Sequence, residues 1–260
     1  MTADPDRFQV RLAQDERDLL GAQRCRYDVF VDELKGDGPL VDHARRLERD
    51  AHDPFYEHLI LVDRQRDDGG LDHVVGAYRL LRSDNAGAAG GYYCAGEYDL
   101  SPLIEGGRKL LELGRSCLRP DYRGGPAMFH IWNGLAEYTL DHEIEVLFGV
   151  ASFRGTDLEA LAAPLTLLHH RHLAPEDLRV RALPDHYEPL NRVPYGGIDR
   201  VAAMLEVPSL IKGYLRLGGF VGDGAFVDHA FNTTDICLIL DTERMNARQR
   251  AIYTRGLNGA

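Results

Sequence analysis

The chain has 260 residues, which is enough for one large domain or two small ones with a substantial core. Its 30 basic and 41 acidic residues give a net charge of −11, which argues against general nucleic-acid binding. The four cysteines stand far apart without a CxxC pair, so we expect reduced thiols and neither a disulfide framework nor a zinc site. Met1 to Phe8 lacks the apolar run of a secretory signal, and no apolar segment approaches the roughly 20 residues that span a bilayer. These features predict a cytoplasmic protein, with peripheral contact at the inner membrane as a further possibility.

The first third of the chain predicts a strand, a helix and a hairpin. Phe8 to Leu12 reads as a short edge strand, and Asp15 to Leu34 carries a loose apolar stripe at helical spacing. Leu40 to Pro54 is highly charged, and its composition indicates a solvated loop or short helix. Two β-branched runs, His58 to Asp63 and His73 to Leu81, read as a hairpin.

The middle of the chain, Leu110 to Glu143, predicts a strand, a charged turn and a long helix. Apolar residues dominate Leu110 to Leu118, and the turn that follows contains Pro120 and Gly124-Gly125. The helix is indicated by apolar residues recurring at i, i+3, i+4 and i+7, namely Met128, Ile131, Trp132, Leu135, Tyr138 and Thr139. Free N–H groups at the start of this helix, with Arg119 and Arg123 beside them, form a candidate anion site for a phosphate.

The last part of the chain predicts further strands and helices. Glu145 to Phe153 reads as a buried strand, and Thr156 to His172 as a helix. Ala174 to Pro208 is a long connection with one strand inside it. A short helix over Pro208 to Gly218 and closing strands within Phe220 to Asp241 follow. We therefore predict one α/β domain over residues 1–260, with a mixed sheet flanked by helices and an extended C-terminal segment, 208–241.

The turn from Arg119 to Ala127 resembles the loop with which the GNAT superfamily of acyltransferases binds a pyrophosphate. That loop usually reads Arg/Gln-x-x-Gly-x-Gly/Ala, whereas Pro126 stands here in the place of the second glycine. The resemblance implies a GNAT fold, and the reduced loop suits the single phosphate on the pantetheine arm of an acyl carrier protein. The residues that it implies for phosphopantetheine binding are Cys117, Leu118, Arg119, Arg123, Gly124 and Gly125.

Four separated motifs are similar to those of the acyl-homoserine-lactone synthases, which are GNAT-fold enzymes that take acyl chains from acyl carrier protein. The motifs are Arg26-x-x-x-Phe30, Asp50-x-x-Asp53, Gly76-x-x-Arg79-Leu80 and Glu112-x-x-Arg115. The tryptophan expected after the first motif is Leu34, which counts against lactone synthesis itself. The resemblance implies substrate contacts from Arg26, Phe30, Asp53 and Arg79.

Two further stretches resemble the ornithine Nα-acyltransferases, the acyl-carrier-protein-dependent enzymes of ornithine-lipid synthesis. They are ELGRSCL-x-PxYR, which begins at Glu112, and Gly218-Gly219-Phe220-Val221-Gly222-Asp223. The resemblance extends from about Phe8 to Asp241. It implies transfer of a 3-hydroxylated fatty acyl group from acyl carrier protein to the α-amine of ornithine, without a cofactor beyond the carrier's thioester arm.

The residues suit this chemistry. Acyl transfer to an amine needs a group that takes the amine proton, and Glu112 is the first candidate, followed by Asp50 and Asp53. Donors must stabilise the developing oxyanion. The carboxylate of ornithine calls for an arginine such as Arg26, Arg79 or Arg115, and its side-chain ammonium for an acid such as Asp50 or Asp53.

Glu112 and Arg115 are three residues apart, so in a regular strand they would point to opposite faces of the sheet. A β-bulge at Gly114 could re-aim one of the two side chains. The sequence therefore predicts an irregular strand between Leu113 and Ser116.

Several alternative interpretations stay open. Glu112 and Arg115 could belong to a structural ion-pair network, and Arg26 and Asp50 could be surface charges. Cys117 could form an acyl-enzyme, although a buried structural thiol is the favoured interpretation because no activating base stands near it. The tract His169 to His172 lacks companion ligands at zinc spacing, so we expect no metal site.

Carrier proteins are acidic, so a chain with a charge of −11 must still offer a local basic face. The candidates for that face are Arg115, Arg119, Arg123 and Lys212. Two rival functions remain: N-acylation of another acceptor, either glutamine or the precursor of a homoserine lactone, and an acyl-carrier-binding domain without catalysis.

Overall fold

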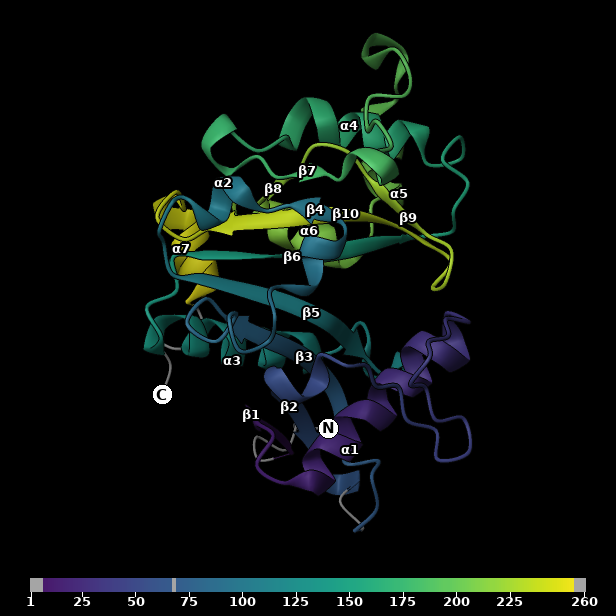
Figure 1. Ribbon diagram of the computed structural model, residues 1–260, viewed down its shortest axis with the longest axis vertical. Coiled ribbons are helices and arrows are strands. Elements are labelled where there is room, and N and C mark those ends of the chain that lie inside the picture. Colours follow the sequence, from purple (N-terminus) through teal and green to yellow (C-terminus); the bar gives the residue numbers. More distant parts are fainter. Residues whose placement is uncertain (1–6, 67–68, 255–260) are drawn as a thin grey trace. The chain divides into compact units, whose positions relative to one another are not determined.

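The computed structural model describes residues 7–66 and 69–254, and these residues form two compact units. Of the described residues, unit 1 comprises 7–66, 69–81, 113–143 and 253–254, and unit 2 comprises Arg82–Glu112 and Ile144–Ile252. The described residues exclude most of the N-terminal stretch in which we expect no secretory signal. They also exclude two residues of the hairpin connection and the last six residues of the predicted domain. Figure 1 shows the elements of both units.

The strands of unit 1 follow the order β1-β2-β3-β5. β1 (Phe8–Leu12) pairs antiparallel with β2 (Glu57–Asp63), which pairs antiparallel with β3 (Val74–Arg82). The second half of β5 (Leu110–Leu118) belongs to this unit, and the first half to unit 2. The predicted edge strand and hairpin are therefore confirmed, with one register shift between Leu61 and Val62.

The first helix of unit 1 changes its type along its length. α1 (Glu16–Arg26) begins at Asp15, whose side chain accepts a hydrogen bond from the Asp18 N–H, as is usual for an N-terminal cap. The chain continues as a π-helix, η1 (Tyr27–Glu33). The helix predicted over Asp15 to Leu34 is therefore confirmed, although its last part is a π-helix, which is wider than an α-helix. Both segments contribute to an apolar cluster with residues of β2, β3 and β5: Ala22, Cys25, Val29, Ile60, Val62, Val74, Ala77 and Cys117.

The long helix of unit 1, α3 (Ala127–Asp141), confirms the helix predicted from the apolar spacing. A Cβ atom added at Gly134 would lie 2.2 Å from Val10 Cγ1 and 3.8 Å from Leu59 Cδ1, so the helix backbone lies directly on β1 and β2. Leu59 and Ile60 are neighbours in β2 and therefore point to opposite faces. Since Ile60 belongs to the cluster of α1, the two helices cover opposite faces of the strands of unit 1.

β5 is irregular where the sequence predicts it. Its parallel pairing with β6 (Val146–Arg154) runs from Leu110 to Glu112, and Arg115 has a positive φ of 49°. The irregularity is confirmed, although the residue in the left-handed region is Arg115 and not Gly114. A non-glycine residue in this region is strained by about 1–2 kcal/mol, so its surroundings must hold it there.

Unit 2 is built on β6 and β10 (Thr233–Asp241), which pair antiparallel along their whole lengths. β8 (Phe220–Val221) and β9 (Phe226–Asp228) pair with β10. β4 (Tyr98–Asp99) and β7 (Arg181–Ala182) form a separate two-stranded sheet. The predicted mixed sheet is thus confirmed, with β5 and β6 as its parallel pair.

Unit 2 contains α2 (Ser101–Ile104), α4 (Ala162–His172), α5 (Arg200–Glu206) and α6 (Ser209–Arg216). α7 (Ala247–Tyr253) follows β10, and only its last residue belongs to unit 1. The helix predicted from Thr156 begins only at Ala162, and the sequence did not predict α5. The remaining short helices are Asp53–Phe55, Arg64–Arg66, Tyr93–Gly96, Pro120–Tyr122, Glu176–Leu178, Pro184–His186 and Tyr195–Gly197. Within residues 7–66 and 69–254, no helix has the length and apolar character needed to cross a membrane.

The close approach of α3 to β1 gives a test of the fold. Gly134→Ala should lower the free energy of unfolding by about 1–3 kcal/mol, because the added methyl group overlaps the branched Val10 side chain. Thermal unfolding measures the effect. Gly87→Ala is the control, since nothing lies within 4 Å of a Cβ there. Adding Val10→Ala to Gly134→Ala should restore part of the stability. An equal loss of stability in Gly134→Ala and in the control Gly87→Ala would contradict the packing of α3 on β1.

Candidate active site

The charged segment between α1 and β2 turns its acidic side chains inward. Leu47 is fully buried and anchors the segment in unit 1. The Asp50 carboxylate accepts hydrogen bonds from the backbone N–H groups of His52 and Asp53, at 2.9 and 3.2 Å. Glu48 and Asp53 are 1% and 5% exposed. The expectation of a solvated segment is therefore wrong for its second half, because the arginines of neighbouring elements compensate the buried charges.

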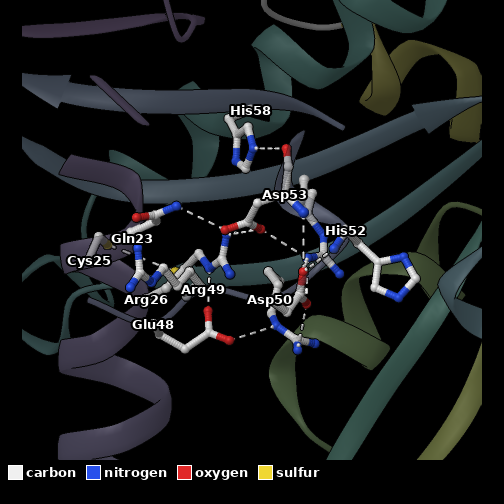
Figure 2. A network of polar contacts seen from close by, with 12 residues as sticks. Gln23, Cys25, Arg26, Glu48, Arg49, Asp50, His52, Asp53 and His58 are labelled. Atoms are coloured by element: carbon white, nitrogen blue, oxygen red, sulfur yellow. Dashed lines mark hydrogen bonds and ion pairs between the residues drawn. The ribbon is translucent and has the colours of Figure 1, made fainter. Parts of the chain in front are cut away.

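Arg26, near the end of α1, is the centre of the resulting network (Figure 2). Its Nε atom donates to Glu48, and its Nη1 atom donates to Asp53 Oδ1 at 2.7 Å. Gln23, one turn earlier on the same helix, donates to the other Asp53 oxygen at 3.0 Å. The network thereby joins α1 to the segment that follows it.

Two arginines from the strands complete the network. Arg79 of β3 donates from Nη1 to both Asp50 oxygens at 2.6 Å and to Asp53 at 3.0 Å, and its guanidinium lies 4.6 Å from the centre of the Tyr56 ring. Arg115 of β5 donates to Glu48 at 3.2 Å and to Asp50 at 3.1 Å. Arg115 thus has a left-handed backbone conformation, and from it the side chain reaches these two carboxylates.

The charges within the network balance, with three guanidinium groups facing three carboxylates. Burial alone would raise the pKa of Glu48, but the charges of Arg26 and Arg115 bring it below its usual value. The pKa values of Asp50 and Asp53 are also lowered, because Arg79 and Arg26 more than offset their burial. The three carboxylates are therefore ionised at neutral pH, as a buried network of this kind requires.

The network gathers most of the residues that the sequence singled out. Arg26, Asp50, Asp53, Arg79 and Arg115 all belong to it, whereas Phe30 packs against the apolar cluster of α1. Glu48 was missed, although it links Arg26 to Arg115. The sequence signal that could have indicated Glu48 is its position two residues before Asp50 and next to Leu47, an apolar residue in a charged segment that the structure shows to be buried. In a charged segment of this kind, the side chains that point inward can be identified only when their partners are known.

Glu112 lies in unit 2 and has a different environment. It is 1% exposed, and its two oxygens accept hydrogen bonds from the backbone N–H groups of Tyr93 and Cys94, at 3.0 and 2.7 Å. These bonds hold the start of the helical turn Tyr93–Gly96. Glu112 therefore fixes the backbone of this turn through both of its carboxylate oxygens.

The Cys117 thiol is buried and lies 3.8 Å from the Cys25 thiol. The contact with Cys25 and the burial of both groups raise the pKa of Cys117 well above its usual value. A thiol with a raised pKa is a poor nucleophile at neutral pH, which favours the structural interpretation over an acyl-enzyme.

The predicted anion-binding loop lies between β5 and α3. Gly124 has a φ of 75°, and both Gly124 and Gly125 are exposed just before the start of the helix. Arg123 is 42% exposed and forms a two-pronged ion pair with Glu33, at 2.8 and 2.7 Å, while its Nε donates to the Leu118 carbonyl. Helix α3 has no side-chain cap at its N-terminus.

The basic face expected for an acidic partner is only partly present among the four candidates. Arg119 is nearly buried and is paired with Asp28 at 2.6 Å and Asp72 at 3.0 Å. Arg115 belongs to the network, and Lys212 lies in a groove of unit 2. In the part of the chain that the structure describes, no cluster of His, Cys, Asp and Glu has the arrangement of a metal site.

Removing one charge should show how much the network stabilises unit 1. Glu48→Gln keeps the shape of the side chain but removes the carboxylate that Arg26 and Arg115 share, which leaves three buried guanidinium groups facing two carboxylates, so the free energy of unfolding should fall by about 3–5 kcal/mol. Denaturant unfolding at neutral pH measures this loss. Glu137→Gln, on the exposed side of α3, is the matched control. A loss no greater than that of the control would mean that the network contributes little.

Comparison with known proteins supports the same fold. Residues 25–133 match the family model described as an acetyltransferase (GNAT) domain. The N-acyl amino acid synthase FeeM from uncultured soil microbes has a TM-score of 0.51 at 11% identity, covering 94% of this chain and 97% of that one. A CoA-dependent acyl-homoserine lactone synthase has a TM-score of 0.50 at 15% identity, covering 94% of this chain and 83% of that one. At these identities the likeness shows the fold alone.

The sequence relatives are more similar. The L-ornithine Nα-acyltransferase of Rhodobacter capsulatus is 56% identical over 259 residues, covering 100% of this chain and 99% of the relative. The protein of the same name from Agrobacterium fabrum is 39% identical over 248 residues, covering 95% of this chain and 85% of the relative. With this similarity over its whole length, and with the matching acetyltransferase domain, the chain belongs to the L-ornithine Nα-acyltransferase family of the GNAT superfamily.

Proposed function

We propose that the protein transfers a fatty acyl group, 3-hydroxylated in the physiological donor, from acyl carrier protein to the α-amine of L-ornithine. The product is a lyso-ornithine lipid, the first intermediate of ornithine-lipid synthesis. The observation that carries the proposal is the 56% identity with an L-ornithine Nα-acyltransferase over the whole chain. The arrangement of charges in unit 1 supports an amino acid as the acceptor.

The acceptor is proposed to bind at the outer edge of the arginine–carboxylate network. Side-chain exposure is 20% at Asp50 and 13% at Arg115, against 5% or less at Arg26, Glu48, Asp53 and Arg79. Asp50 is suited to an ammonium group because its lowered pKa keeps it ionised. Arg115 is suited to a carboxylate, with which a guanidinium forms two parallel hydrogen bonds. The buried members then hold these two groups in place.

Transfer itself requires that the amine lose a proton, attack the thioester carbonyl and expel the thiol, which takes up a proton. The lowered pKa values of Asp50 and Asp53 make them weak proton acceptors. We therefore propose Glu112 as the acceptor of the amine proton, directly or through water. Arg115 is proposed as a donor to the developing oxyanion or to the substrate carboxylate.

The donor is proposed to bind with its phosphate at the turn before α3. The exposed glycines Gly124 and Gly125, the uncapped N-terminus of α3 and the exposed guanidinium of Arg123 support this assignment. Leu118, Arg119 and Cys117 hold the turn from the strand side and are proposed to border the pantetheine arm. No cofactor is proposed beyond that arm, because the thioester itself activates the acyl group.

We further propose that the protein acts in the cytoplasm with peripheral contact at the inner membrane, where the lipid product is needed. Carrier protein is the proposed macromolecular partner. N-acylation of glutamine or formation of a homoserine lactone is the competing reaction, and a catalytically inactive carrier-binding domain is the competing role.

The proposal is tested by thiol release from 3-hydroxyacyl-carrier protein, with ornithine, glutamine, lysine and S-adenosylmethionine offered separately. Release with ornithine and detection of N-acyl-ornithine by mass spectrometry are expected. Release only with S-adenosylmethionine would identify a lactone synthase, and release only with glutamine would identify another N-acyl-amino-acid synthase. No release with any acceptor would favour the binding domain.

Arg123→Glu should weaken the use of carrier protein far more than it destabilises the fold. The reversal removes a cation from the proposed phosphate site and also places a carboxylate beside Glu33. We expect KM for the acyl-carrier donor to rise by about tenfold or more, with little change in KM for ornithine. Glu33→Gln is the control, because it breaks the same ion pair but keeps the cation. Equal losses of stability and of donor use would count against the assignment.

Glu112→Gln should lower kcat by about 100-fold or more if Glu112 accepts the amine proton. The discriminating measurement is the dependence of kcat on pH in enzyme that thermal unfolding shows to be folded. Loss of a proton acceptor removes the fall of kcat on the acidic side, whereas a purely structural change leaves the profile in place. An unchanged dependence of kcat on pH would mean that Glu112 only holds the Tyr93–Gly96 turn and does not accept the amine proton.

A further inference from the structure

A basic and apolar groove lies in unit 2, and of its lining residues only Lys212 is a candidate for the face that meets carrier protein. It has a volume of about 470 Å³ and is formed by helices α4, α5 and α6. Its lining residues are Leu167, Arg171, His172, Arg200, Val201, Met204, Leu205, Lys212 and Arg216. Four of these side chains are basic and none is acidic, in a chain whose net charge is −11. The groove therefore concentrates positive charge against the charge of the whole protein.

The four cations differ from the arginines of unit 1 because no carboxylate among the described residues pairs with them. Lys212 donates to the Leu205 carbonyl at 3.2 Å, and Arg200 lies 5.9 Å from the centre of the Tyr195 ring. Within residues 7–66 and 69–254, none of Arg171, Arg200, Lys212 and Arg216 has an acidic partner within ion-pair distance. Their charge is thus available to an anionic ligand.

Two of the apolar side chains that line the groove are highly exposed on the surface of unit 2. Val201 and Leu205 are four residues apart on α5 and so lie on one side of the helix. They are 73% and 74% exposed, more than any other large apolar side chain among the described residues. Met204 and Leu167 also line the groove. Exposed aliphatic side chains surrounded by basic residues are typical of surfaces that enter the headgroup region of a membrane.

We propose that this groove and the outer side of α5 dock the protein on a membrane surface of anionic phospholipids. The cations contact the headgroup phosphates, and Val201 and Leu205 enter the boundary between headgroups and acyl chains. Charge complementarity supports this occupant, since several unpaired cations attract an anionic surface. Side chains that protrude by three quarters of their area suit a yielding acyl layer better than a folded partner, which would need a matching pocket. The inference rests on the peripheral membrane contact in the proposed function and assigns a surface to it, and it can be tested without the acyl-transfer reaction.

The test is co-sedimentation of the full chain with vesicles of phosphatidylcholine alone or mixed with phosphatidylglycerol. We expect binding to the anionic vesicles only, weakened by raising the salt to about 0.5 M, because salt screens the headgroup charge. The double variant Arg200→Glu/Arg216→Glu should reduce the partition coefficient by about tenfold or more. Arg45→Glu/Arg248→Glu changes the net charge equally at exposed positions outside the groove and should bind like the original protein.

The apolar contribution is tested separately. Val201→Ser/Leu205→Ser should also weaken vesicle binding, whereas Ile104→Ser, at a side chain that is 54% exposed on α2, should not. All variants should release thiol from the acyl-carrier donor at the original rate without vesicles, so failure of docking and failure of catalysis are distinguished. Absence of binding to anionic vesicles, or equal binding by groove and control variants, would overturn the proposal. A raised KM for the carrier-bound donor with unchanged vesicle binding would overturn it in favour of a carrier-protein dock.

Discussion

Charge balance within the buried arginine–carboxylate network is the constraint on which unit 1 depends. Each of its groups would be costly to remove from water alone, and each is accepted because a partner of opposite charge faces it at hydrogen-bond distance. The partners come from α1, from the segment before β2, and from β3 and β5. These elements must therefore assemble together, since leaving one of them out would strand a buried charge. The network also explains why the charged segment before β2 follows a defined path although it contains little regular secondary structure.

The backbone of β5 adapts to this network. Arg115 adopts a left-handed conformation that is unfavourable for a residue with a side chain, and the ion pairs with Glu48 and Asp50 compensate the strain. A regular strand would turn this side chain away from the carboxylates. Strain and electrostatics thus meet at the same residue, which is also one of the two partly exposed members of the network. This coincidence supports a role for Arg115 in binding the substrate as well as in holding the fold.

Basic residues have two distinct environments in this protein. In unit 1, arginines such as Arg26, Arg79 and Arg119 are committed to internal carboxylates, so they add little to the field outside the molecule. In unit 2, the cations of the α4–α6 groove have no acidic partner among the residues that the structure describes. The net charge of −11 therefore does not describe the surface locally, and an anionic ligand can be attracted to one region while the rest of the chain repels it.

The sequence by itself determined most of the elements, though not α5, and the chemical class of this protein. Apolar spacing located α3, and β-branched runs located β2 and β3. The motifs around Arg26, Asp50, Arg79 and Glu112, through their resemblance to known enzymes, indicated an N-acyltransferase of GNAT fold. These features are local, so a short stretch of chain is enough to reveal them. Only the tertiary structure decided that Glu48 joins the network, that Arg119 is turned inward, and that α5 presents two exposed aliphatic side chains beside unpaired cations. Whether a charged side chain is buried or free depends on partners from distant elements, and a linear pattern does not contain that information.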